Sequence, residues 1–331
     1  MLRLLTVMCL LSHLGMAQKQ KPKHIGFLMD DFYSVRWIKD STAFASKVRQ
    51  LGHRVSIRVC DSDTALQHRQ VKELIKEGVD VLVITPEDCN SASRLVETAH
   101  RHHIPVIAYD RLILNSDLDY YVSFDAHKVG EMQARFMVDS LHGKGTIMLV
   151  NGPKSDQNAT SFREGQLKVL QPYVASGRIT LAYDNQISEW TLLEALMETN
   201  GFLAGYNGKI DGVIAANDEL AEGVLEAFSF SRPNIKLPIT GQDANPPACT
   251  RLVKGTQAMT VFKPVDSLAY EAAYLACSVA MGEHPVTTNT VYNGKKQVPF
   301  FQMHPILLTR QNVKKYIFDT GYYPDLGKEI K

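Results

Sequence analysis

The sequence predicts an α/β fold with two doubly wound parallel-sheet domains. Short apolar runs alternate with segments whose apolar residues recur at helical spacing, which is typical of β–α–β units in a parallel sheet. The alternation runs from Ile25 to Arg111 and begins again near Tyr120. The length of 331 residues also exceeds one typical domain and suits two.

Apolar runs in the first half are predicted to be strands, and the amphipathic segments between them to be helices. A buried parallel strand is a nearly continuous hydrophobic run, as Val81-Leu82-Val83-Ile84 is. Gly52 gives the first helix a stop, and Asp61-Ser62-Asp63 offers the second helix an N-cap. The expected strands are 25–29, 55–59, 81–84 and 105–109, and the expected helices are about 35–51, 64–77 and 91–102.

The second half repeats this pattern and then becomes less regular. The run from Val265 to Met281 is strongly helical, and it can belong to the first domain only if the chain crosses back near Lys263. A further helix is expected to open after Asn217. The other expected strands are 120–125, 146–150, 179–183, 212–216, 238–243 and 259–263, and the other expected helices are about 129–141, 158–170, 192–199 and 310–318.

The N-terminus has the pattern of a secretory signal peptide over residues 1–17. Arg3 supplies a positive charge, residues 4–14 are largely apolar, and Gly15-Met16-Ala17 offers small residues at a cleavage site. A membrane anchor is the weaker alternative, because the apolar run is too short to span a bilayer. We therefore expect cleavage after Ala17 and an exported, soluble mature protein.

Charge and motifs argue against several classes of function. The formal net charge of +1 gives no global field toward nucleic acid or an anionic membrane. The sequence contains neither G-x-G-x-x-G nor G-x-x-x-x-G-K-[ST], the glycine patterns that bind phosphate groups. His100, His102 and His103 end a predicted helix, where cationic side chains favour the helix dipole, so no metal site is expected there.

Four cysteines remain after the predicted cleavage, and their spacings match no zinc pattern. An exported protein meets oxidising conditions, so a disulfide such as Cys249 with Cys277 is possible. Free buried thiols are the favoured alternative. The four residues are Cys60, Cys89, Cys249 and Cys277.

Polar residues follow several predicted strands at the point where each strand ends. Asp110-Arg111 follows one apolar run, and Asp30-Asp31, Asn217-Asp218 and Gln242-Asp243 follow others. In open α/β sheets, ligands collect in the crevice beyond the carboxyl ends of the strands. A carboxylate beside a guanidinium suits a small, neutral, polyhydroxylated ligand. A structural ion pair is the alternative for one such pair, but their repetition in both halves favours a ligand site.

The two tryptophans lie at predicted strand-to-helix turns, one in each half. Trp37 follows Arg36 at the start of the first helix, and Trp190 follows the strand 179–183. A sugar ring has apolar C–H faces, so a flat aromatic wall beside planar polar groups complements it. The structural alternative is that each tryptophan fills the edge of a core.

Motifs for catalysis are missing from the sequence. It contains neither G-x-S-x-G nor H-E-x-x-H, and no cysteine has a recognisable catalytic frame. A pair of carboxylates could act on a glycosidic bond. However, Asp110, Asp156, Asp218 and Asp243 each lie beside an amide or a basic residue, which suits hydroxyl binding and holds the acids ionised. We therefore do not expect an enzyme.

The chain resembles the type I periplasmic sugar-binding proteins that serve ABC importers, and among them the xylose-binding proteins. The resemblance covers about His24 to Tyr323. The motifs that carry it are Asp30-Asp31, Arg36-Trp37-Ile38-Lys39-Asp40, residues 78–84, Ala108-Tyr109-Asp110-Arg111, Ser123-Phe124-Asp125, residues 161–170, Gly241-Gln242-Asp243-Ala244 and residues 255–261.

The resemblance implies a sugar site between the two domains, with no cofactor and no metal. Position by position, Trp37 and Asp156 match lining positions, and the others match sugar contacts. The implied sugar-binding residues are Arg36, Trp37, Asp110, Arg111, Asp156, Asn158, Trp190, Asn217, Asp243 and Lys263.

It further implies the periplasmic binding protein type I fold, with two lobes joined by a three-strand hinge. The crossovers are expected near 123–125, Lys263 and 291–298. The N-terminal lobe would comprise residues 24–122 plus 264–291, and the C-terminal lobe residues 123–263 plus 292–331. Sugar binding would stabilise closure of the lobes.

The implied function is that of a monomeric periplasmic receptor for a monosaccharide, with D-xylose as the first candidate. It would deliver the sugar to the permease of an ABC importer. Two alternatives stay open at this point: another pentose or hexose as ligand, and a sensing role in which the closed receptor signals to a membrane histidine kinase.

Overall fold

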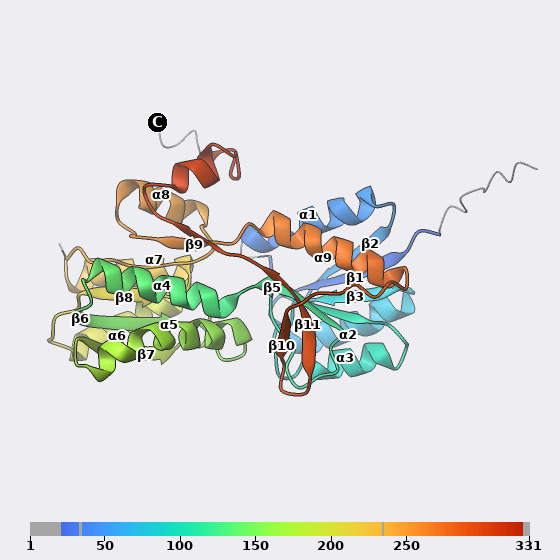
Figure 1. Ribbon diagram of the computed structural model, residues 1–331, viewed down its shortest axis with the longest axis horizontal. Helices are drawn as coiled ribbons and strands as arrows, with labels where there is room; N and C mark the ends of the chain where they lie inside the picture. The colour runs from blue at the N-terminus through green and yellow to red at the C-terminus, as the bar shows by residue number, and fades with distance from the viewer. Residues whose placement is uncertain (1–20, 33–34, 234, 327–331) are drawn as a thin grey trace, which may run out of the picture.

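The structure, a computed structural model, describes residues 21–32, 35–233 and 235–326. Two lobes of sheet and helix lie side by side, and the chain passes between them in the middle of the molecule (Figure 1). The predicted α/β architecture with parallel sheets is confirmed. The predicted signal peptide, residues 1–17, lies outside the described residues.

A mostly parallel sheet forms the centre of the first lobe. Among the described residues its strand order is β10-β11-β5-β4-β3-β1-β2, and β10 with β11 is the antiparallel pair. The strands are β1 (His24–Met29), β2 (Arg54–Val59), β3 (Val81–Ile84), β4 (Val106–Tyr109), β5 (Tyr120–Phe124), β10 (Thr290–Tyr292) and β11 (Gln297–Met303).

Helices cover both faces of this sheet, so its strands are apolar on both sides. Along β1, Phe27 packs toward α1 (Val35–Gln50) and α9 (Val265–Ala280), while Leu28 packs toward the opposite face. That opposite face is covered by α2 (Thr64–Lys76) and α3 (Ser93–His100). The long helix predicted after Lys263 thus packs beside α1 in the first lobe.

The second lobe has a smaller sheet, with strand order β7-β6-β8 in the described part of the chain. Its strands are β6 (Gly145–Asn151), β7 (Ile179–Gln186) and β8 (Gly212–Ala215). The helices α4 (Ala126–Ser140) and α5 (Gln157–Ala175) pack together, as do α6 (Leu192–Gly205) and α7 (Asp218–Ser231) (Figure 1). The lobe is completed by α8 (Pro246–Lys254), β9 (Thr260–Phe262), β12 (Ile306–Leu308) and a π-helical turn η1 (Lys314–Phe318).

Two glycines let α4 and α5 approach closely. A Cβ atom at Gly130 would lie 1.9 Å from the carbonyl oxygen of Phe162, and one at Gly165 would lie 2.2 Å from the carbonyl oxygen of His127. Backbone atoms cannot be displaced as a flexible side chain can, so only glycine fits at this crossing.

The third crossover differs from the prediction. Strand β11 pairs in parallel with β5, and Val298 and Phe300 are buried in the core of the first lobe. The predicted boundary at residue 292 is therefore wrong, because Gln297–Met303 belongs to the first sheet. The chain instead crosses between the end of β11 at Met303 and the start of β12 at Ile306.

Two smaller expectations also change. The strand expected over 238–243 is reduced to isolated bridges at Ile239 and Gln242. The helix expected over 310–318 is the shorter turn η1.

The four cysteines of the described chain are buried free thiols, as favoured from the sequence: Cys60, Cys89, Cys249 and Cys277. Within the same residues, we find no helix with the length and apolar character needed to cross a membrane.

Candidate functional site

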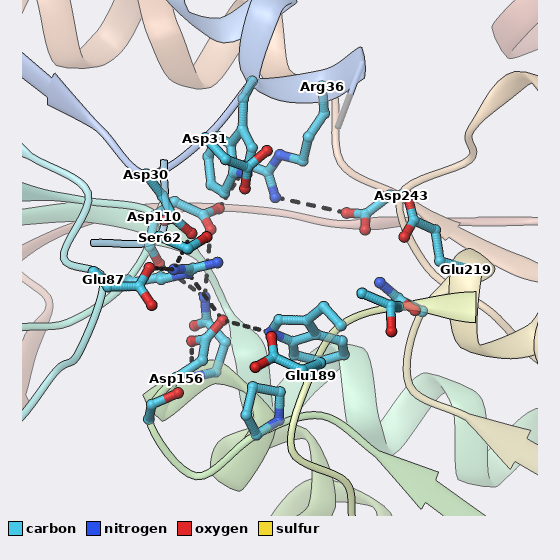
Figure 2. Close-up of a pocket in the computed structure, with 18 of the residues that line it drawn as sticks. Asp30, Asp31, Arg36, Ser62, Glu87, Asp110, Asp156, Glu189, Glu219 and Asp243 are labelled. Carbon is cyan, nitrogen blue, oxygen red and sulfur yellow. Dashed lines mark hydrogen bonds and ion pairs between the residues drawn. The ribbon is translucent and has the colours of Figure 1, made fainter. Parts of the chain in front are cut away.

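A cavity of about 290 Å³ lies between the lobes, at the carboxyl ends of their strands. Figure 2 shows acidic side chains of both lobes, together with Arg36 of the first lobe, around this space. All ten residues predicted from the sequence line it: Arg36, Trp37, Asp110, Arg111, Asp156, Asn158, Trp190, Asn217, Asp243 and Lys263. Contact of these side chains with a sugar stays a prediction.

The turn after β4 holds Asp110 in an uncommon conformation, with φ at 60°. Its carbonyl oxygen accepts hydrogen bonds from the Tyr121 hydroxyl at 2.8 Å, the Ser123 hydroxyl at 2.7 Å and the Asn158 amide at 3.1 Å. Asp and Asn tolerate the left-handed region better than most residues. These three bonds fix the turn, and therefore the place of the Asp110 carboxylate.

Arg36, from the first turn of α1, holds acidic groups from both lobes. Its Nη2 lies 2.8 Å from Asp110 Oδ1, and its Nη1 lies 3.6 Å from Asp243 Oδ1. Burial alone would raise the pKa of Asp110, but the charges of Arg36 and Lys263 outweigh it and lower that pKa to about 2. The Asp110 carboxylate therefore acts as a hydrogen-bond acceptor at neutral pH.

Arg111 spans the cleft. Its Nη1 lies 2.7 Å from Asp30 Oδ2 in the first lobe, and its Nε lies 3.0 Å from Asp156 Oδ2 in the second. Trp37 supports both guanidinium groups, because the centre of its ring lies 4.1 Å from the Cζ of Arg36 and 5.6 Å from that of Arg111. Trp37 is 4% exposed, so it serves as a buried wall beneath the charged groups.

Trp190 forms the facing wall in the second lobe. Its Nε1 donates a hydrogen bond to Asp156 Oδ2 at 3.1 Å, and its ring meets Phe162 edge-on at 6.4 Å between centroids. A Cβ atom at Gly152 would lie 2.3 Å from the Trp190 ring. Gly152 is therefore needed for the ring to lie against the end of β6.

Two predicted site residues also cap helices. Asp156 Oδ1 accepts from the Asn158 N–H at 2.8 Å at the start of α5, and Asn217 Oδ1 accepts from the Leu220 N–H at 2.9 Å at the start of α7. An Asp or Asn cap satisfies a helix N–H group that would otherwise lack a partner. The strand-helix turns thus fix both side chains at the cavity.

Asp243 and Lys263 complete the site from the second lobe and the hinge. Lys263 Nζ lies 3.1 Å from Asp243 Oδ1, and the Gln242 amide donates to the same oxygen at 2.8 Å. Gln242 is 3% exposed and, in the described structure, its Oε1 has no hydrogen-bond partner. That oxygen is a buried acceptor without a partner, in a residue that lines the cavity.

A buried aspartate supports this corner from behind. Asp218 accepts from the Gln257 amide, the Thr260 hydroxyl and the Asn245 N–H, and burial raises its pKa to about 7. Its own N–H donates to the Gln242 carbonyl at 3.0 Å. Asp218 therefore ties the α7 start to the Gln242 loop and to β9, which leads to Lys263.

Other residues of the cavity were absent from the predicted site. Glu87 follows β3, as Asp110 follows β4, so the rule that polar groups gather at strand ends could have found it. Phe162 lies inside α5 and carries no such signal. The additional lining residues include Asp30, Asp31, Ser62, Glu87, Phe162, Glu189, Glu219 and Gln242.

The site as a whole combines charged donors and acceptors with aromatic walls. Hydrogen bonds to charged groups are stronger than neutral ones, and aromatic faces cover apolar C–H surfaces. The arrangement can bind a small polyhydroxylated molecule between two lobes that are already in contact through Arg111 and Asp156. Fold and site together define a two-lobed ligand-binding protein.

Comparisons with known proteins agree. Residues 25–284 match the family described as periplasmic binding protein domain. The chain is 38% identical to the D-xylose-binding periplasmic protein of Escherichia coli (strain K12), with 97% of each chain covered. It is 36% identical to the D-xylose-binding periplasmic protein of Haemophilus influenzae, with 97% of this chain and 96% of that chain covered.

A solved structure gives the same answer for the fold. An ABC transporter solute binding protein from Clostridium phytofermentans, with bound β-D-glucose, superposes with a TM-score of 0.87 at 28% identity, covering 93% of this chain and 100% of that chain. The chain belongs to the periplasmic binding protein family, and its fold is the type I fold of that family.

Proposed function

We propose that this protein is a periplasmic receptor that binds a monosaccharide between its lobes, with D-xylose as the first candidate. The observation that carries the proposal is the cavity itself: the ten residues that the xylose-binding resemblance implies converge there from both lobes. Similarity to two D-xylose-binding periplasmic proteins over nearly the whole chain supports the choice of sugar.

The geometry suits a neutral sugar. Charged hydrogen bonds contribute roughly 1.5–3 kcal/mol each, and a micromolar complex requires only about 8 kcal/mol in total. Arg36, Asp110 and Arg111 supply such bonds from the first lobe, and Asp243 and Lys263 supply them from the other side of the cleft. A few of them suffice after the costs of association and lobe closure.

We further propose that the mature protein acts in the periplasm after cleavage behind Ala17, as a monomer that hands its sugar to an ABC import permease. Similarity to an ABC transporter solute binding protein supports this partner. A binding role, without turnover of the sugar, follows from the same family resemblance. Incubation with D-xylose or a xyloside tests it, since product formation would contradict a receptor.

A thermal-shift screen over pentoses and hexoses tests the proposed function. A ligand that binds only the folded state at 100 times its Kd stabilises that state by about 2.7 kcal/mol, which raises the Tm by several degrees. We expect D-xylose to give the largest shift. A Tm unchanged by every sugar would contradict the proposal, and a larger shift with another sugar would reassign the ligand.

A further inference from the structure

Glu87 is an acidic residue that lines the cavity and is not among the sugar-binding residues described above. It follows β3 through Thr85 and Pro86, and its side chain is 22% exposed. In Figure 2 it lies beside the group formed by Asp30, Asp110 and Asp156. Because Glu87 lies among other acids of the cavity, its charge state has to be explained.

A carboxyl oxygen of Glu87 lies within 4.8 Å of a carboxyl oxygen of Asp30. Two ionised carboxylates this close repel each other, and a proton on one of them removes that repulsion and lets it donate a hydrogen bond to the other. Arg111 does not replace that proton. Its Nη1 lies 2.7 Å from Asp30 Oδ2 but 4.0 Å from Glu87 Oε2, and its Nε lies 3.0 Å from Asp156 Oδ2.

A bound metal ion is a poorer account of this cluster. The ligand atoms of Asp30, Cys60 and Glu87 lie within 4.8 Å of one another. However, the Arg111 guanidinium already supplies a positive charge in direct contact with Asp30. A cation beside it would be repelled.

The surroundings place the proton on Glu87. Burial and the neighbouring carboxyl groups of Asp30 and Glu189 raise the pKa of Glu87 to about 8, against the charge of Arg111, which lowers it. Burial also acts on Asp30, but the Arg111 charge outweighs it and lowers the pKa of Asp30. The closer contact of Arg111 with Asp30 therefore favours the carboxylate on Asp30 and the proton on Glu87.

The groups that face Glu87 come from several elements. Asp30 follows β1, Cys60 follows β2 and Arg111 follows β4, all in the first lobe. Glu189 follows β7 and faces Glu87 from the second lobe. Burial raises the pKa of Cys60 to about 12, so its thiol stays neutral. Ionised Glu87 would meet like charges on both sides of the cleft.

We propose that Glu87 is a further residue of the sugar site, that it acts as a neutral carboxylic acid sharing its proton with Asp30, and that sugar binding therefore weakens as this proton is lost. This inference rests on the proposed function and adds a proton to the bound state. A sugar that fills the cavity removes water from Glu87, and this desolvation favours the neutral acid.

The direction of the pH effect follows from linkage. A group whose pKa is higher in the bound state takes up protons on binding, so affinity is greatest at low pH and falls as the pH rises through the bound-state pKa. For Glu87 the fall ends above about pH 8. None of the described residues lining the cavity is a histidine, so the usual titrating group of this range is missing from it.

The test is calorimetric titration with D-xylose, or with the sugar that the thermal-shift screen selects, at pH 6.5 and pH 9. We expect the wild-type Kd to be at least threefold larger at pH 9, and the ratio for Glu87→Gln to fall below 1.5. Glu189→Gln keeps the Asp30–Glu87 pair, so its ratio should stay above 1.5. Asp218 also titrates near pH 7, behind the cavity, so the comparison between variants is essential.

A second measurement covers the case in which Glu87→Gln does not fold. Wild-type titrations at pH 8 in phosphate and in Tris give the number of protons taken up, because these buffers differ in ionisation enthalpy. Uptake supports the inference, and zero uptake overturns it.

The remaining outcomes are distinct. Equal wild-type affinity at both pH values, or an unchanged ratio in Glu87→Gln, overturns this inference and leaves the proposed function intact. No binding of any sugar at either pH overturns both.

Discussion

Arg111 of the first lobe and Asp156 of the second lobe meet across the cleft, with Nε 3.0 Å from Oδ2. Both side chains are less than a tenth exposed. The same guanidinium contacts Asp30, and the same carboxylate accepts from Trp190. One ion pair therefore links the charged end of the cavity in one lobe to its aromatic wall in the other, and a ligand in the cleft lies beside both.

Removing the charged groups of the first lobe should weaken sugar binding. We expect Arg111→Ala and Asp110→Asn each to raise the Kd at least about tenfold, because each loses a charged hydrogen bond of roughly 1.5–3 kcal/mol. Asn is chosen at position 110 because it tolerates the φ of 60° there. Calorimetry on the purified variants measures the change.

A matched control is available at the surface. Arg69 is 60% exposed, pairs with Asp63 at 3.8 Å and is not one of the residues that line the cavity. Arg69→Ala should leave the Kd unchanged, since exposed ion pairs contribute little. If Arg111→Ala bound the sugar as tightly as Arg69→Ala, Arg111 would not belong to the site.

Trp190 should report binding optically. The chain has two tryptophans, and Trp37 is 4% exposed beneath two guanidinium groups. We expect Trp190→Ala to weaken binding and to remove most of the sugar-induced change in tryptophan fluorescence. Trp190→Phe keeps an aromatic face and should retain more affinity than the alanine variant. Parental affinity in Trp190→Ala would refute the stacking role.

The low pKa of Asp110 predicts a pH dependence of stability. Arg36 and Lys263 outweigh burial and lower this pKa from 3.8 to about 2, so the carboxylate contributes about 2 kcal/mol above pH 4. A depressed pKa gives stability that is lost as the pH falls through the folded-state value. Urea unfolding should thus show a gap between the parent and Asp110→Asn that narrows from pH 5 to pH 2.5. A gap that stays constant over this range would contradict the assignment.

The α4–α5 crossing should not tolerate a side chain at Gly165. Its Cβ would lie 2.2 Å from the His127 carbonyl oxygen, so we expect Gly165→Ala to lower the free energy of unfolding by about 1–3 kcal/mol. Gly201 in α6 is the control, because a Cβ there meets nothing within 4 Å. Gly201→Ala should be neutral or slightly stabilising by helix propensity. Equal effects of the two substitutions in chemical denaturation would contradict the close packing.

Much of the fold and site was predictable because the signals are local. Apolar runs at strand and helix period gave the elements of both lobes, and polar residues at strand ends such as Asp110 and Asn217 marked the cavity. Helix capping explains why such residues are fixed there. Asn217 lies in the turn after β8 and is the N-cap of α7.

What the sequence could not predict depends on contacts between distant segments. Strand β11 joins the first sheet through its pairing with β5. Its sequence contains Pro299 and only two buried residues, Val298 and Phe300, so it reads as a connecting segment. The need for glycine at position 152 is visible only in the structure, where the Trp190 ring packs against it. The charge of Glu87 likewise depends on Asp30, Arg111 and Glu189, which come from three other turns.

Calorimetric titration of the wild-type protein with D-xylose at neutral pH tests sugar binding most directly. We predict saturable binding of one sugar per chain, with a Kd on the order of micromolar or tighter, and loss of at least tenfold in affinity in Arg111→Ala. Absence of binding by D-xylose and by every other pentose and hexose, in protein that is folded by circular dichroism, would contradict this prediction.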